Sequence, residues 1–427
     1  MSALLFVHGT GVRQPAYDET LELLRTALAR IAPGAPVHDC YWGDTFGVPA
    51  NAGTAALPAA QPGAPVPGPG LPPLPGAQPG APVPGPGLPA DDPAPEEELT
   101  SEDRQAVVWG ALYDDPLAVL RRPEDDGQGL GAPAFGDRSG PEVGHRARAL
   151  AEDPPERLTA LLDLAGGPAA FRASLSAVLD SGPGRDALTH GLGPGQLPQA
   201  VATATVAHLL GGALRRGTPV LWTTDQRDEA VRVVTGELGG QARGIGLGVL
   251  VLHGWAAHRF GVMRAVEKRR AWLMTRIHPQ AGDILKYLAR GAALRAFIKD
   301  RVTAVAREHG PVTLLAHSLG GIAAVDLLAQ EELPGVRHLV TVGSQAAHLH
   351  EIGALPGLDP GKPLPEHFPA WTNVYDARDL LGFPAEPVFP ARVTDLELSS
   401  GQPFPAAHSG YFPNPEVHRL LGRLLGA

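Results

Sequence analysis

The chain has 427 residues, of which 44% are hydrophobic, and a formal net charge of −10. This composition is that of a globular protein, and the length allows one large domain or two ordinary ones. The acidic balance provides no electrostatic footprint for phosphate backbones, so we expect no nucleic-acid partner. Cys40 is the sole cysteine, which excludes an intrachain disulfide and a cysteine-based metal site. We therefore expect a cytoplasmic protein.

The first segment has the pattern of a strand, a helix and a second strand. Ala3 to Val7 is a compact apolar run, residues 17–31 carry apolar side chains at helical spacing, and Pro36 to Trp42 is predicted as a second strand. Short joints between such elements indicate a βαβ unit in a parallel sheet. We assign residues 1–46 to the first part of this sheet.

A Pro/Gly-rich, low-complexity segment follows. The string QPGAPVPGPGLP occurs twice, starting at Gln61 and at Gln78. Proline removes backbone donors and glycine raises the entropic cost of ordering, so such a segment cannot form a packed core. The sequence predicts a disordered linker over residues 47–98.

Residues 99–281 have helical segments separated by Gly/Pro breaks, for example at 157–163, 201–216 and 228–237. We interpret this region as a helical insertion or cap. Its most apolar stretch, residues 244–257, is shorter than the ~20 residues that a spanning helix needs. A buried helix is the favoured interpretation, and a helix in peripheral contact with a membrane is the alternative.

The α/β pattern resumes at residue 282. Strands are predicted at 312–316, 337–342, 371–375 and 391–398, and helices at 284–309, 320–332 and 416–425. Short apolar runs that alternate with helices are typical of a doubly wound α/β sheet. Residues 282–427 are therefore predicted to complete the sheet.

The strongest chemical motif is VTLLAHSLGG, residues 312–321. A buried strand enters a sharp turn at Ser318 and a helix leaves at once, which is the context of a nucleophile elbow. Small residues must flank such a serine so that strand and helix can approach, and Ala316 and Gly320 meet this need, while His317 precedes the serine in the turn. A helix N-cap serine is the alternative interpretation.

The second motif is His8-Gly9-Thr10-Gly11, directly after the first strand. Acyl transfer develops an oxyanion, which two preorganised backbone N–H groups must stabilise. We predict that Thr10 donates one N–H, because the flanking glycines let the loop turn inward, and that Leu319 donates the other. An ordinary strand-to-helix turn is the alternative, and the loop lacks the G-x-G-x-x-G or Walker pattern of a phosphate-binding loop.

Together, HGTG, LLAHSLGG and the later VTVGS resemble the lipase and esterase branch of the α/β-hydrolase superfamily, most of all the inositol-deacylase-like and bacterial lipase-like serine hydrolases. The resemblance covers the two terminal segments. It implies an α/β-hydrolase-type, mostly parallel sheet, and because no strand precedes the HGTG strand, this sheet should be shortened at its N-terminal edge.

The resemblance also implies the chain order serine, acid, histidine. Asp379 has the spacing that the family's acid has after its strand, and Asp376 is the alternative, with a turn-capping role otherwise. His408 lies in a loop between the last strand and the closing helix and is the predicted histidine. His367 precedes the acid strand and His418 lies within the final helix, so neither is favoured.

These residues predict hydrolysis of a carboxylic ester through an acyl-serine intermediate, with no cofactor and no metal. The resemblance and the helical cap favour a lipid-like or apolar ester. An amidase, peptidase or thioesterase would use the same residues. The alternative from another class is a catalytically silent hydrolase-fold scaffold, whose protein partners the sequence does not identify.

Overall fold

The computed structural model describes residues 2–48, 100–121, 139–192, 195–240 and 282–426. These described residues, apart from Thr100, belong to one compact unit. All but residues 47 and 48 of the predicted linker at 47–98 lie outside the described residues. The apolar stretch at 244–257 lies outside them entirely.

A six-stranded sheet forms the centre of the sheet-bearing part, with the strand order β2-β1-β3-β4-β5-β6. All five pairings are parallel. The sequence prediction of a mostly parallel α/β sheet is thus confirmed. The strands are β1 (Ala3–Val7), β2 (Val37–Cys40), β3 (Val312–His317), β4 (Val336–Val342), β5 (Ala370–Tyr375) and β6 (Val393–Glu397).

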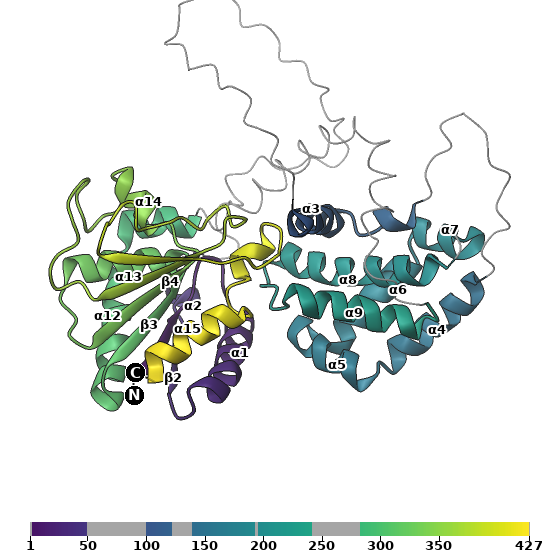
Figure 1. Ribbon diagram of the computed structural model, residues 1–427, viewed down its shortest axis with the longest axis horizontal. Coiled ribbons are helices and arrows are strands. Elements are labelled where there is room, and N and C mark those ends of the chain that lie inside the picture. The colour runs from purple at the N-terminus through teal and green to yellow at the C-terminus, as the bar shows by residue number, and fades with distance from the viewer. Residues whose placement is uncertain (1, 49–99, 122–138, 193–194, 241–281, 427) are drawn as a thin grey trace, which may run out of the picture. The chain divides into compact units, whose positions relative to one another are not determined.

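Helices cover both faces of this sheet (Figure 1). On one face, α1 (Ala16–Ile31) and α15 (Pro415–Gly426) pack on side chains such as Leu4 and Phe6. On the other face, α12 (Ala292–His309) and α13 (Leu319–Gln330) pack on Ala3, Leu5 and Val7. Alternate residues of β1 therefore enter different cores, as the two-residue period of a strand buried on both faces requires.

A separate hydrophobic core lies in the helical region that follows residue 100. Trp109, Leu158, Phe171, Val206 and Trp222 belong to it and are almost completely buried. Its helices are α3 (Ser101–Asp114), α4 (Gly140–Glu152), α5 (Glu156–Leu162), α6 (Gly167–Leu179), α7 (Gly182–His190), α8 (Leu197–Arg216) and α9 (Thr224–Glu237), with 3-10 turns at Ala118–Leu120 and Asp163–Ala165. The helical content predicted between residues 99 and 281 is thus found in its described residues.

Helix α8 is the central helix of this core. The stretch Leu197–Arg215 is long and apolar enough to cross a membrane, yet 89% of its most apolar window is buried within the protein. Such burial is that of a core helix. Among the described residues it is the one helix of this kind, so the evidence for a membrane span is weak.

The predicted helix at 284–309 is wrong in one respect. Residues 282–290 and α12 are separate helical segments joined by a turn at Gly291. Glycine is unfavourable within a helix, and a Cβ at this position would lie 2.6 Å from the carbonyl oxygen of Tyr287. Two short elements were not predicted: α14 (Ala346–Glu351) after β4, and the helical turn α2 (Gly43–Phe46) after β2.

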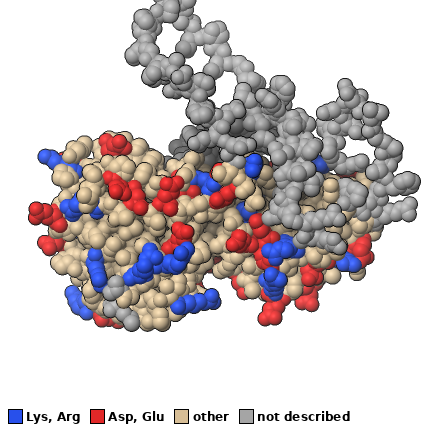
Figure 2. Space-filling view, viewed as in Figure 1, with Lys and Arg blue, Asp and Glu red and all other residues tan. Residues whose placement is uncertain are grey.

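Acidic and basic side chains are interspersed on the face of the molecule shown in Figure 2. Ion pairs across elements join Arg301 to Asp39 and Lys299 to Glu331. No extended stripe of one sign follows the described residues of this face.

Candidate active site

The strands β1 and β3 are neighbours in the sheet although more than 300 residues separate them in the chain. Val7 pairs with Ala316, so the loops after the two strands leave the same edge of the sheet side by side. From β1, the chain continues to β2 on one side of the sheet, whereas β3 lies on the other side of β1, so the strand order reverses at β1. Open α/β sheets bind ligands where the strand order reverses, outside the carboxyl ends of the strands.

The turn at Ser318 has the strained backbone expected of a nucleophile elbow. Ser318 has φ of 51° and ψ of −120°, and within the described residues only Ala391 shares a positive φ without being glycine. A non-glycine residue in this region costs about 1–3 kcal/mol, so the surrounding structure must impose it. Gly320 allows the chain to pack closely at this turn, because a Cβ at this position would lie 2.5 Å from the carbonyl oxygen of His8.

The HGTG loop contacts this elbow directly. A Cβ added at Gly9 would lie 2.7 Å from the Cβ of Ser318, so only glycine permits this approach. The backbone N–H groups of Thr10 and Leu319 have no hydrogen-bond partner among the residues that the structure describes. Two free donors therefore lie on the two segments that meet at Ser318.

His8 orients the first peptide of this loop. Its Nε2 accepts a hydrogen bond from the backbone N–H of Trp42 at 3.1 Å, so the proton is on Nδ1, which donates to the carbonyl oxygen of Gly9 at 2.8 Å. Burial lowers the pKa of His8 to about 3, which keeps the ring neutral. A trans peptide directs its N–H away from its C=O, so this bond also sets the direction of the Thr10 N–H.

The predicted acid and histidine are in direct contact. The Nδ1 atom of His408 lies 2.8 Å from Oδ2 and 3.0 Å from Oδ1 of Asp379. Two further hydrogen bonds reach the same carboxylate, from the backbone N–H of Leu381 at 3.0 Å and the hydroxyl of Tyr411 at 2.8 Å. Burial raises the pKa of Asp379, but the His408 ring and these hydrogen bonds outweigh it, and the net direction is downward. The carboxylate stays ionised.

His317 links the elbow to the histidine loop. Its Nε2 donates to the carbonyl oxygen of His408 at 2.8 Å, and the two ring centroids are 4.6 Å apart. Burial and the neighbouring His408 lower the pKa of His317 to about 3, so this ring is neutral as well. Since His317 directly precedes Ser318, the contact brings the His408 loop to the nucleophile elbow.

Two buried polar atoms of this cluster have no hydrogen-bond partner among the described residues: Oγ of Ser318 and Nε2 of His408. Ser318 is 1% exposed and the His408 side chain 12% exposed. A buried polar atom without a hydrogen-bond partner costs about 1–3 kcal/mol. Such an atom needs an explanation, and a site where a reacting molecule supplies the partner is one.

Asp376 has a different environment from Asp379. Its Oδ1 accepts the backbone N–H of Arg378 at 2.9 Å, and its Oδ2 accepts the N–H and the hydroxyl of Ser400 at 2.7 Å and 2.6 Å. No hydrogen bond joins it to His408 among the described contacts. The alternative acid is thus a loop-fastening carboxylate in this structure.

The loop that carries His408 is also fastened to the helical region. Gln402 accepts a hydrogen bond from the hydroxyl of Tyr113 at 3.1 Å and donates to the carbonyl oxygen of Trp222 at 3.2 Å. The hydroxyl of Ser409 accepts the backbone N–H of Val220 at 3.2 Å. The helical region therefore helps to hold the histidine loop.

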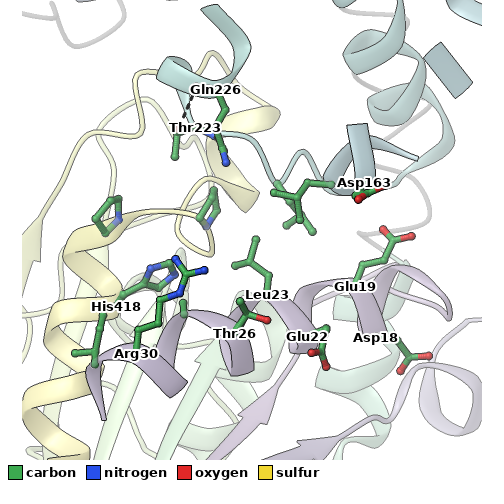
Figure 3. Close-up of a pocket in the computed structure, with 16 residues that line it drawn as sticks. Asp18, Glu19, Glu22, Leu23, Thr26, Arg30, Asp163, Thr223, Gln226 and His418 are labelled. Atoms are coloured by element: carbon green, nitrogen blue, oxygen red, sulfur yellow. Dashed lines mark hydrogen bonds between the residues drawn. The ribbon is translucent and has the colours of Figure 1, made fainter. Parts of the chain in front are cut away.

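A separate pocket of about 840 Å³ lies beside α1. Figure 3 shows Asp18, Glu19 and Glu22 toward one end and Arg30 and His418 toward the other. None of the residues that form the Ser318 cluster lines this pocket. Its size therefore does not make it the candidate active site.

Two residues at the site were not found by sequence reasoning. Tyr411, three residues after His408, donates to Asp379, and Asp283 accepts the backbone N–H of Gly11 at 2.9 Å. Only proximity to His408 could have drawn attention to Tyr411. Asp283 is 272 residues from its partner and follows no recognisable motif.

No group of three or more His, Cys, Asp or Glu side chains that could hold a metal occurs in the described part of the chain. A scan of protein-family models and a search of curated proteins both gave no match to this chain. The sheet and its flanking helices are a generic α/β fold that is compatible with the α/β-hydrolase resemblance.

Proposed function

We propose that this protein is a serine hydrolase that cleaves a carboxylic ester through an acyl-enzyme on Ser318. The observation that carries the proposal is the convergence of four chain segments, at residues 8–11, 317–320, 376–379 and 408, on one sheet edge. Each segment supplies a group that acyl transfer needs: a nucleophile, a base, an acid that orients the base, and two free N–H donors.

In the proposed reaction, Nε2 of neutral His408 takes the proton of the Ser318 hydroxyl as its Oγ attacks the ester carbonyl. Asp379 accepts the Nδ1–H, which leaves Nε2 as the lone-pair nitrogen and stabilises the imidazolium that forms. The N–H groups of Thr10 and Leu319 stabilise the oxyanion. His408 then protonates the leaving alcohol, and the reverse sequence with water releases the acid and restores Ser318.

The substrate proposed is an apolar or lipid-like ester, on the strength of the sequence resemblance. A series of p-nitrophenyl esters of increasing acyl length tests this. We expect kcat/KM to rise with chain length, because each added CH₂ that is buried contributes about 0.8 kcal/mol. A flat or falling series would contradict the apolar-ester proposal, and turnover of amide or thioester analogues alone would favour the other hydrolase classes.

A fluorophosphonate probe tests the reaction class. The wild-type protein should be labelled at Ser318, and Ser318→Ala should lose both labelling and turnover while its melting temperature changes little. Loss of a triad member typically lowers the rate by about 10⁴- to 10⁶-fold. Ser174→Ala is the matched control, because it removes another buried serine hydroxyl, in α6. A folded wild-type protein that is not labelled would favour the silent scaffold.

A further inference from the structure

Asp283 is a buried carboxylate outside the four segments of the proposed site. It is 3% exposed and lies in the helical segment of residues 282–290. Its Oδ2 accepts the backbone N–H of Gly11 at 2.9 Å, and its Oδ1 accepts the backbone N–H of Val48 at 2.5 Å. A buried carboxylate is costly unless hydrogen bonds compensate for lost water, and here each oxygen has a backbone donor.

The bond to Gly11 fixes the peptide that follows Thr10. The peptide that precedes Thr10 is fixed by the bond from His8 to the carbonyl oxygen of Gly9. Because peptides are planar, holding the planes on both sides of a Cα atom restricts both of its backbone dihedrals. The direction of the Thr10 N–H is thus set from both sides.

The bond to Gly11 has a second consequence. It occupies the N–H that follows Thr10 in the loop, so this donor is not available to a substrate oxygen. Gly11 has φ of 68°, a left-handed conformation that suits glycine. The Thr10 N–H then remains as the free donor of this turn.

We infer that Asp283 is a positioning residue for the oxyanion-stabilising loop, acting through the Gly11 N–H on the donor direction of Thr10. This inference rests on the proposed function. A carboxylate suits the role because two N–H groups converge on it and it can accept from both. In Asp283→Asn, an amide NH₂ would face one of these N–H groups, and that hydrogen bond would be lost.

Lys286 provides a matched control. It lies one turn further along the same helix and donates to the carbonyl oxygen of Gly47 at 2.9 Å, so it fastens the same 47–48 segment without contact to the HGTG loop. Lys286→Met therefore reports the effect of loosening residues 47–48 alone. Asp283→Ala removes both acceptors and therefore reports that effect together with release of Gly11.

The test uses p-nitrophenyl acetate as substrate and phenylboronic acid as a probe that forms a tetrahedral adduct with a reactive serine. Asp283→Ala should lower kcat by about 10²-fold, because a misplacement of about 1 Å costs that much, while KM changes less than about threefold. Inhibition by the boronic acid should weaken by a similar factor, since it reports binding of the tetrahedral state. The pH profile should keep its shape, because the contact between His408 and Asp379 is untouched.

Two results would overturn the inference: an Asp283→Ala variant as active as wild type, or equal losses in Asp283→Ala and Lys286→Met. If Asp283→Ala does not fold, Asp283→Glu decides, with the same fall in kcat at nearly constant KM expected. A wild-type protein without esterase activity or probe labelling would instead refute the proposed function, so the two failures are distinguishable.

Discussion

The assignment of the acid can be decided by comparing two carboxylates that lie three residues apart. Asp379→Asn should lower the rate of acylation by about 10⁴-fold. In the structure both oxygens of Asp379 lie within 3.0 Å of Nδ1 of His408, so the ring donates its Nδ1–H to this group. An amide nitrogen in place of one oxygen favours the other tautomer, in which Nε2 carries the proton and cannot accept one from Ser318.

Asp376→Asn should affect stability more than catalysis. Asp376 accepts three hydrogen bonds, from Arg378 and Ser400, and an asparagine oxygen can keep only part of them. Loss of one bond to a buried group costs about 1–3 kcal/mol, so we expect a lower melting temperature and less than tenfold loss of acylation.

The assay for both variants is single-turnover acylation at one pH, because product release can mask the chemical step in steady-state rates. Thermal unfolding of each variant separates loss of fold from loss of chemistry. The reasoning is refuted if Asp376→Asn loses more acylation than Asp379→Asn. Small losses in both would place the acid elsewhere.

Three further predictions follow from packing and burial. Acid should destabilise the protein through His8 and His317, whose folded pKa of about 3 lies below the ordinary 6.5. The unfolded rings bind protons that the folded rings do not, so the free energy of unfolding falls as pH decreases below about 6.5, by on the order of 3 kcal/mol per ring at pH 4. Calorimetry from pH 7 to 4 should show a smaller decrease for His317→Gln, and an unchanged decrease would contradict this cause. Gly320→Ala should destabilise the protein by about 1–3 kcal/mol, because its Cβ would meet backbone oxygens at 2.5 Å and 2.8 Å. The control is Gly236→Ala in α9, whose Cβ meets nothing within 4 Å and which should be neutral or stabilising. Equal denaturant midpoints of the two variants would refute the close packing at Gly320. Arg295→Met should lower the free energy of unfolding by about 3–5 kcal/mol, because it leaves the fully buried Asp326 without the guanidinium at 2.8 Å. An unchanged midpoint of urea unfolding would contradict this prediction.

The strands and the elbow could be predicted because their signals are local. Apolar runs of five to seven residues bounded by turns identified β1, β3, β4 and β5 to within one or two residues. Ser318 could be proposed because its strand, turn and helix are consecutive in the chain. The same holds for the HGTG loop, which directly follows β1.

Contacts between distant segments could not be predicted, because no local pattern encodes them. The sequence left Asp376 and Asp379 as competing acids, and their side chains differ only in the partners that tertiary structure brings to them. Asp283 is the clearest case, because it lies 272 residues from Gly11 in the chain and no motif in the sequence around it indicates this partner.

The helical region was expected to act as a cap that could cover the site. Its contacts show that it also holds the loop that carries His408. Tyr113, Val220 and Trp222 bond to Gln402 and Ser409, which flank His408 in one short loop, and Ala406 is packed within the helical core. A rigid movement of the described helices away from the sheet would break these bonds and displace the proposed base. Access of substrate to Ser318 must therefore leave these contacts in place if His408 is to act, so the described helices between residues 101 and 240 are better regarded as a fixed support of the histidine loop than as the moving part of a lid.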